Sequence, residues 1–149
     1  MIKLSRLTDY AVVILAAMAR RDDDMTSASS LSAATSLPEP TVSKVLKMLA
    51  KDGIITSSRG ANGGYALNRP PEQVMISDVI AAIEGPIALT ACVEGSHESC
   101  AIEKSCMLRG RWNVVNAAIQ TALDNVTLAD MLRPDGGFAA KATEEDARL

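Results

Sequence analysis

The residues best suited to chemistry are three cysteines within 15 residues of one another, Cys92, Cys100 and Cys106. Their spacing does not match the paired C-x2-C pattern of a zinc finger or zinc ribbon. Thiolates this close together can instead hold a soft metal or an iron–sulfur cluster, which takes four ligands. Unligated cysteine is normally a buried apolar residue, whereas these lie among Glu, Ser and Gly. We therefore expect metal or cluster ligation, and the spacing alone does not choose between the two.

Three cysteines leave the fourth ligand of such a site to be found. The candidates within the same loop are a histidine and three acids, His97, Glu94, Glu98 and Glu103. The single histidine also raises the alternative of a cysteine nucleophile with an imidazole base. No orienting carboxamide, oxyanion hole or substrate-pocket pattern accompanies this pair. We therefore expect no enzymatic activity and no small-molecule substrate.

A second set of functional candidates lies between Pro40 and Asp52. Apolar residues recur there at the spacing i, i+3, i+4 and i+7, which predicts a helix with one buried face. These residues are Val42, Val45, Leu46 and Leu49. The opposite face carries hydroxyl and ammonium groups, from Thr41, Ser43, Lys44, Lys47 and Lys51. Such a face is suited to DNA recognition.

Two short β-prone runs follow, at 54–58 and 65–67, and a glycine-rich connection separates them. Its Asn62-Gly63-Gly64 sequence permits positive φ angles, which favours a β-hairpin. Short helices followed by a basic hairpin form the order of a winged helix-turn-helix. The alternative is a small helical domain with an unremarkable hairpin. We favour DNA binding because basic residues occupy both the exposed helix face and the hairpin tip.

The charge distribution supports a nucleic-acid partner although the whole chain has a net charge of −3. Residues 1–69 contain nine Lys/Arg and six Asp/Glu, whereas residues 70–149 contain six and twelve. The cationic part therefore coincides with the predicted winged helix, which fits binding to double-stranded operator DNA. Three helix residues are expected to face the major groove, namely Thr41, Ser43 and Lys44. Lys47 is expected to contact phosphate, and the wing residues Arg59 and Asn62 to reach the minor groove or its phosphates.

The C-terminal part predicts a means of pairing two copies of the chain. A short helix is expected over 77–84, a long helix over 105–125 and a helical turn over 127–132. The long helix carries an apolar stripe, composed of Leu108, Trp112, Val115, Ile119 and Ala122. One small domain covers only part of this surface, so we expect a partner helix from a second copy. The alternative is a helix that packs only over its own domain.

These patterns predict a mainly α fold, a winged helix-turn-helix with a small β-hairpin wing and a long C-terminal dimerisation helix. Residues 1–70 form the expected DNA-binding domain, 71–132 the cluster-binding loop and dimerisation helix, and 133–149 a disordered tail. The longest apolar run, 10–19, is about half of the roughly 20 residues needed to cross a bilayer. Asp9 precedes this run and arginines follow it, which argues against an export signal. We expect a cytoplasmic protein without a membrane partner.

The motifs together resemble the Rrf-two family of bacterial winged-helix regulators, whose best-known members sense iron–sulfur clusters, nitric oxide or iron. The resemblance covers about residues 1–132. The matching stretches are Lys3-Leu4, Thr8-Asp9-Tyr10-Ala11, Thr41-Val42-Ser43-Lys44-Val45-Leu46, Ser58-Arg59-Gly60, Gly63-Gly64-Tyr65-Ala66-Leu67, Ser77-Asp78-Val79-Ile80 and Ile83-Glu84-Gly85. The run from Glu84 to Cys92 looks closest to the branch that regulates the SUF iron–sulfur assembly operon, the IscR-like regulators.

The resemblance implies a homodimer that represses iron–sulfur assembly genes and holds a [2Fe-2S] cluster on Cys92, Cys100 and Cys106. Regulators of the IscR type place a histidine ligand three residues after the last cysteine, and that position is Arg109 here. Relatives that sense nitric oxide use an aspartate from the other subunit, and Asp9 stands at the matching position. Asp9 is therefore the first choice for the fourth ligand. The alternatives are a nitric-oxide- or iron-responsive regulator of the same fold, and a metal-binding interaction protein that does not regulate DNA.

Overall fold

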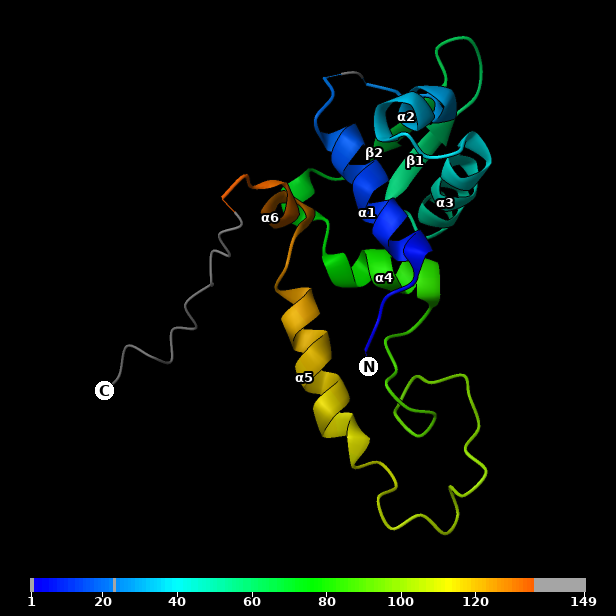
Figure 1. Ribbon diagram of the computed structural model, residues 1–149, viewed down its shortest axis with the longest axis vertical. Coiled ribbons are helices and arrows are strands. Elements are labelled where there is room, and N and C mark those ends of the chain that lie inside the picture. The colour runs from blue at the N-terminus through cyan, green and yellow to red at the C-terminus, as the bar shows by residue number, and fades with distance from the viewer. Residues whose placement is uncertain (1, 23, 136–149) are drawn as a thin grey trace, which may run out of the picture.

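The computed structural model of the chain describes residues 2–22 and 24–135. The elements in chain order are α1 (Arg6–Ala19), α2 (Ala28–Thr35), α3 (Glu39–Lys51), β1 (Ile55–Ser58), β2 (Gly64–Leu67), the 3-10 helix η1 (Pro71–Gln73), α4 (Ile76–Glu84), α5 (Trp112–Asp124) and α6 (Leu128–Leu132). Helices α1 to α4, the hairpin and α6 gather in one part of the molecule, and α5 extends from it beside the long loop 85–111 (Figure 1). The expected mainly α class with a two-stranded antiparallel hairpin is confirmed.

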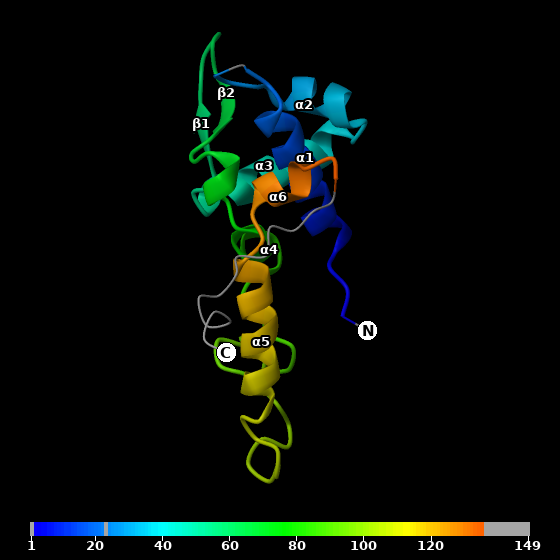
Figure 2. The ribbon, with the colours of Figure 1, turned by 90° about the vertical axis from the view of Figure 1, so that its left-hand side faces the viewer.

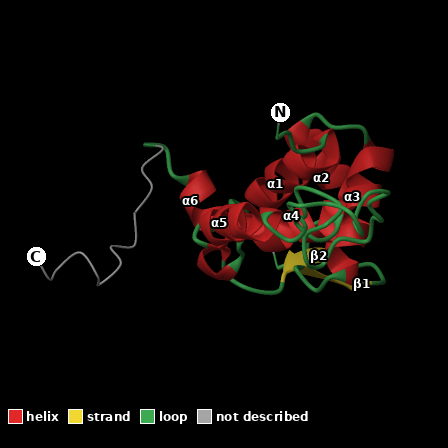
Figure 3. Ribbon diagram, turned by 90° about the horizontal axis from the view of Figure 1, so that it is seen from below, coloured by secondary structure: helices red, strands yellow, loops and turns green. Residues whose placement is uncertain are grey.

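The hydrophobic core lies between the helices of the winged-helix part. Its fully enclosed members are Ala11, Ile14, Leu15, Leu31, Val42, Val45, Leu46, Leu49, Val74, Val79 and Leu128. The α1 and α3 members recur at helical spacing, so each of these helices buries one face and leaves the other in solvent. Seen from below, α1, α2 and α3 cluster on one side with the two strands beneath them (Figure 3).

Ser5 and Thr8 define the start of α1. The helix begins at Arg6 and Ser5 caps it, since the Ser5 hydroxyl accepts from the Thr8 amide at 3.3 Å. Thr8 is only 1% exposed and its own hydroxyl donates to Glu84 of α4. A residue in the first turn of α1 therefore makes a tertiary contact with the end of α4.

The C-terminal helix is shorter than predicted. A helix from 105 to 125 was expected, but α5 has 13 residues and begins at Trp112. Gly110 adopts φ 74°, in the left-handed region, which interrupts helical geometry just before that point. The preceding residues form a series of turns, so Leu108 of the expected apolar stripe lies outside the helix.

The chain returns to the winged-helix part after α5. The amide of Leu128 donates to the Val74 carbonyl at 2.8 Å, and the amide of Ile76 donates to the Val126 carbonyl at 2.9 Å. A capping box at Thr127 and Asp130 starts α6, and Leu128 is 0% exposed. The predicted domain boundary at residue 70 stays a prediction, and the core includes side chains from both sides of it. The predicted tail, 133–149, lies outside the described residues beyond Asp135.

No helix in the described ranges is long and apolar enough to cross a membrane.

Candidate nucleic-acid interface and cysteine loop

Helix α3 presents the polar face predicted from the sequence. Its buried residues are Val42, Val45, Leu46 and Leu49. On the remaining surface Lys44 and Lys47 are exposed, while Thr41 and Ser43 are half-buried. The two lysines are three residues apart and thus lie on one side of the helix. This face offers two cations and two hydroxyl groups to a polyanion.

The turn between α2 and α3 sets the direction of α3. Ser36 takes a left-handed conformation with φ 59°, which ends α2. The Ser32 hydroxyl then donates to the Leu37 carbonyl at 2.6 Å, and Pro38 starts the next helix. Because proline fixes φ and Ser32 holds the turn from inside α2, the connection is short and stiff. This is the arrangement of a helix-turn-helix.

The wing is the hairpin β1–β2, in which Ile55 pairs with Leu67 and Ser58 with Gly64. Both residues predicted to contact DNA from its tip, Arg59 and Asn62, are exposed. The tip lies at the end of the molecule opposite α5 (Figure 1). The side view shows the same separation of the wing from the loop 85–111 (Figure 2).

A backbone bridge that the sequence pattern did not reveal holds the base of the wing. Thr26, before α2, and Tyr65 of β2 exchange two backbone hydrogen bonds of 2.9 and 2.8 Å. This approach requires glycine next to it, because a Cβ on Gly64 would lie 2.7 Å from the Thr26 carbonyl oxygen. The wing is thereby tied to the start of α2. The only sequence signal for this contact was the paired glycines at 63 and 64.

The cysteine loop, residues 85–111, carries Cys92, Cys100 and Cys106, each half-buried. The Cys92 thiol lies 3.3 Å from the Thr90 hydroxyl. Among the described residues, no three His, Cys, Asp or Glu side chains are close enough to hold a metal ion. The structure therefore does not bring the three predicted ligands together, and Asp9, exposed in the first turn of α1, does not join them.

Two asparagines of α5, unassigned in the sequence analysis, attach the start of this loop. Asn116 accepts from the Leu89 amide at 3.0 Å and donates to the Ile87 carbonyl at 2.9 Å. Asn113 accepts from the Glu94 amide at 3.0 Å. Asparagines three residues apart share a helix face, and this spacing was the available sequence signal.

Glu84, the last residue of α4, joins the loop to the N-terminus of α1. Its carboxylate accepts from the Ser5 amide at 2.8 Å and from the Thr8 hydroxyl. Partial burial raises the pKa of Glu84, but the hydrogen bonds from Thr8 and Ser5 outweigh it and hold the pKa below the ordinary value of 4.5. The carboxylate is thus stabilised in its charged form beside the first turn of α1.

An open cleft of about 770 Å³ is lined by the N-terminal segment, the end of α4, the cysteine loop and α5. One wall is apolar and comes from α5, with Trp112, Val115, Ile119 and Leu123. Trp112 and Val115 remain 44% and 43% exposed, and α5 has no buried residue. A single copy of the chain therefore leaves this helix face uncovered.

Residues 4–134 match the family described as "Rrf2: Iron-dependent Transcriptional regulator". The chain belongs to the Rrf2 family. Its structure is similar to CymR (YrzC), described as the global cysteine regulator of B. subtilis, with 27% identity, a TM-score of 0.66 and coverage of 89% of this chain and 97% of that chain. It is also similar to T. potens IscR, with 29% identity, a TM-score of 0.63 and coverage of 98% and 96%. A putative transcriptional regulator from Listeria innocua shares 29% identity with a TM-score of 0.68 and coverage of 95% and 93%. The resemblance inferred from the motifs is confirmed.

Three thiol donors in one loop of an Rrf2 protein fit an iron–sulfur cluster by their chemistry, because soft thiolates are its usual ligands. Arg109, at the position where IscR-type regulators have a histidine, forms a salt bridge of 2.9 Å with Glu103. A guanidinium has no lone pair to donate to iron. A cluster bound in this loop would therefore take its fourth donor from another residue.

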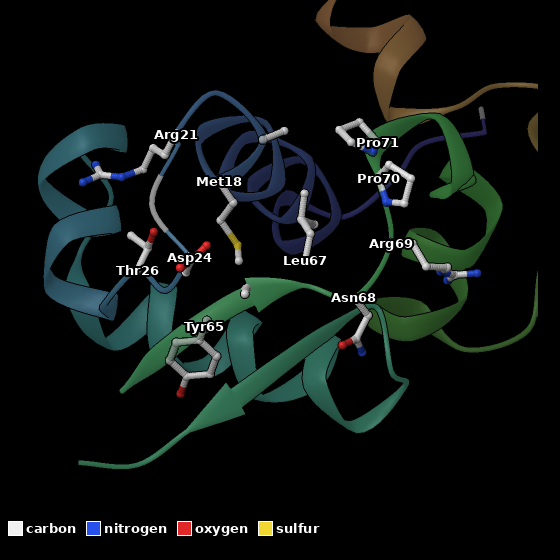
Figure 4. Close-up of a pocket in the computed structure, with 12 residues that line it drawn as sticks. Met18, Arg21, Asp24, Thr26, Tyr65, Leu67, Asn68, Arg69, Pro70 and Pro71 are labelled. Atoms are coloured by element: carbon white, nitrogen blue, oxygen red, sulfur yellow. The ribbon is translucent and has the colours of Figure 1, made fainter. Parts of the chain in front are cut away.

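A second hollow of about 340 Å³ lies in the Rrf2 winged-helix part, between the end of α1, β2 and η1 (Figure 4). Figure 4 shows Arg21 and Arg69 directed away from its centre. Arg69 pairs with Asp78 at 3.6 Å. Neither of these arginine side chains is therefore placed to hold an anion inside this hollow.

Proposed function

We propose that this Rrf2 protein is a dimeric repressor of iron–sulfur cluster assembly (SUF) genes whose DNA affinity depends on a [2Fe-2S] cluster in the cysteine loop. One observation carries the proposal: a winged helix with a cationic recognition face and a three-cysteine loop occur in the same chain. The similarity to T. potens IscR supports it. We assign the protein no enzymatic role and no small-molecule substrate.

The DNA-binding part of the proposal rests on α3 and the wing. A helix fits the major groove, and in the proposed complex Thr41, Ser43 and Lys44 on the polar face of α3 contact base edges. Lys44 is exposed and the other two are half-buried, which supports this assignment. Lys47 contacts phosphate at the border of that face. Arg59 and Asn62, at the exposed wing tip, reach the neighbouring minor groove or its phosphates.

This part is tested by fluorescence anisotropy with the promoter of the protein's own operon, with a SUF promoter and with a scrambled duplex of equal length. We expect tighter binding to the promoters, by at least about 1,000-fold, because specific sites typically exceed non-specific ones by this factor. Equal affinity for all three duplexes at physiological salt would contradict a role as an operator-specific repressor and favour an interaction protein.

The cluster part of the proposal names Cys92, Cys100 and Cys106 as ligands, with Asp9 as the first choice for the fourth. When bound, the cluster supplies a site that reacts with oxidants and nitric oxide and whose properties depend on its ligands. Because Asp9 lies in the first turn of α1, next to the buried Thr8, ligation by it links the loop to the DNA-binding part. A ligand that binds one arrangement better shifts the population toward it.

Visible absorption of anaerobically purified protein tests the cluster. We expect a coloured protein, loss of colour in each Cys→Ala variant, and an altered spectrum or lifetime in air for Asp9→Ala. Asp22→Ala, another exposed acid beyond the end of α1, is the matched control. A colourless protein containing zinc, or an apo-protein that binds the operator as tightly as the holo-protein, would contradict the cluster switch. A spectrum that responds only to nitric oxide or iron would favour the alternative signals.

The homodimer rests on the uncovered face of α5. A second copy of this helix would cover Trp112, Val115 and Ile119, and a two-fold dimer would present two recognition helices to DNA. Ile119→Glu buries an unpaired charge in that dimer and should produce monomers in sedimentation velocity. Thr121→Glu, on the opposite and exposed side of α5, is the control. A dimer of unchanged affinity in Ile119→Glu would remove α5 from the interface.

A further inference from the structure

The cysteine loop is attached to the rest of the molecule over only part of its length. Its segment 87–94, here called the anchored segment, is held by three side-chain hydrogen bonds from Asn113 and Asn116 of α5. Val93 within it is 5% exposed and so is packed like a core residue. Cys92 lies between the bonded residues Leu89 and Glu94, so its backbone is fixed from both sides.

The far part of the loop, residues 99–111, here called the distal segment, has no such side-chain hydrogen bond to the rest of the molecule among those described. Each hydrogen bond described for it joins residues three positions apart, as in the bond of the Glu103 amide to the Cys100 carbonyl and that of the Arg109 amide to the Cys106 carbonyl. The salt bridge between Glu103 and Arg109 also lies within it. The distal segment lies beyond the N-terminal end of α5, on the side away from the winged-helix part (Figures 1 and 2).

The side chains of the distal segment are also poorly packed. Ile102, Met107 and Leu108 are 61%, 96% and 60% exposed, although each is a large apolar residue. A segment with local hydrogen bonds and few buried contacts opens at low free energy. Cys100 and Cys106 therefore lie on a part of the loop that can move, whereas Cys92 lies on a part that is held.

We propose that Asn113 and Asn116 are positioning residues that hold Cys92 as the fixed side of the cysteine site, while the distal segment closes on it to bring Cys100 and Cys106 into place. This inference rests on the proposed cluster function. It accounts for a loop that carries three suitable donors yet does not gather them among the described residues. The hydrogen bonds described for the two asparagines all go to backbone groups of the loop, so their role is to position and not to ligate.

The geometry also explains why two asparagines serve this role better than one. Asn116 uses both ends of its amide, accepting from Leu89 and donating to Ile87, which fixes the direction of the chain as it leaves α4. Asn113, one turn nearer the start of α5, accepts from Glu94 just after Cys92. Loss of either contact frees one flank of Cys92, and loss of both frees the whole anchored segment.

Hydrogen exchange of the cluster-free full-length protein tests the positioning directly. We expect Asn116→Ala to speed exchange of the Leu89 amide, and Asn113→Ala that of the Glu94 amide, by about five- to thirtyfold, the effect of losing one or two hydrogen bonds. Asn116→Asp keeps the acceptor for the Leu89 amide but loses the donor to the Ile87 carbonyl. Exchange of the Leu89 amide should therefore be slower in Asn116→Asp than in Asn116→Ala, though still faster than in the wild type. Gln120→Ala, whose side chain bonds only Asp124 within α5, is the control and should leave both amides unchanged.

Alkylation of the same proteins, followed for each thiol by peptide mass spectrometry, measures the cysteines themselves. In the wild type Cys100 and Cys106 should react faster than Cys92. In the asparagine variants the Cys92 rate should rise several-fold, while the rates of the other two thiols stay constant. Unchanged exchange at Leu89 and Glu94, or equal reactivity of the three thiols in the wild type, would overturn the inference.

The cluster itself supplies an outcome that separates this inference from the function on which it rests. Reconstituted Asn116→Ala should lose its visible absorption in air faster than the wild type and Gln120→Ala. If the wild type stays colourless while the Leu89 amide still exchanges faster in Asn116→Ala, the iron–sulfur function is overturned and the positioning of Cys92 by the asparagines is supported. A coloured Asn116→Ala of wild-type lifetime would overturn the positioning role and leave the iron–sulfur function intact.

Discussion

The backbone amide of Ser5 donates a hydrogen bond of 2.8 Å to the carboxylate of Glu84, which lies 79 positions further along the chain. The Thr8 hydroxyl donates to the same oxygen. One side chain thereby holds the first turn of α1 at the end of α4, where the cysteine loop begins. The contact joins the DNA-binding helices to the proposed sensing loop through a single carboxylate.

This contact predicts an acid-sensitive contribution to stability. The pKa of Glu84 lies below 4.5 in the folded protein, so its stabilisation is present above pH 4.5 and disappears as the pH falls through the lower folded value. Glu84→Ala should lower the free energy of unfolding at pH 7 by about 1 kcal/mol, the usual effect of lost hydrogen bonds. Urea unfolding at pH 7 and pH 3 checks this, with Glu72→Ala, an exposed glutamate of η1, as control. A Glu84→Ala deficit of equal size at both pH values would contradict it.

The close approach of β2 to Thr26 predicts a strong effect of a methyl group at position 64. A Cβ there would lie 2.7 Å from the Thr26 carbonyl oxygen, and Gly64 has φ 152°. Gly64→Ala should destabilise the protein by about 1–3 kcal/mol and weaken operator binding, since the wing base must shift. Gly60→Ala is the control, because Gly60 has φ 108° but nothing within 4 Å of its Cβ position. Equal loss of melting temperature in both variants would indicate backbone strain without a clash.

Two lysines of α3 are predicted to act differently on DNA. Lys47→Ala should lower affinity for every sequence and flatten the plot of log K against log salt concentration by about 0.9, the loss of one phosphate contact. Lys44→Ala should cost about 1–3 kcal/mol on the operator and relax its specificity. Both side chains are exposed on the same helix, and each variant removes one positive charge. A difference between the two variants therefore does not come from the loss of charge alone. Operator binding unchanged in both Lys44→Ala and Arg59→Ala would contradict the placement of the interface.

The return of the chain into α6 predicts that a residue far from the winged-helix motif stabilises it. Leu128 is 0% exposed in the core, so Leu128→Ala should lower the free energy of unfolding by about 2–5 kcal/mol. Met131→Ala in the same helix should have a small effect, because Met131 is 53% exposed. Thermal unfolding of the two variants checks this. Similar melting temperatures would show that α6 contributes little to the domain.

The elements whose patterns are local were predictable. Apolar residues at helical spacing indicated α3, and glycines with an Asn-Gly step indicated the hairpin, because helix and turn formation depend on neighbouring residues. The same holds for the exposed positions of Lys44 and Lys47. The family motifs were local as well, and the match over residues 4–134 confirms them.

The contacts that position the cysteine loop depended on the tertiary structure. Thr8 is buried and donates to Glu84, and Asn116, which carried no signal of its own beyond its spacing from Asn113, holds Leu89. α5 begins at Trp112 and not at 105, where the apolar spacing alone predicted its start. Each of these outcomes results from hydrogen bonds or backbone angles that involve distant residues or a single glycine. The sequence by itself determined that α3 is helical, that a hairpin follows it and that the cations of this part lie on their exposed faces. Only the tertiary structure decided where α5 begins and which polar side chains join the loop to the helices, because these outcomes depend on contacts between residues far apart in the chain.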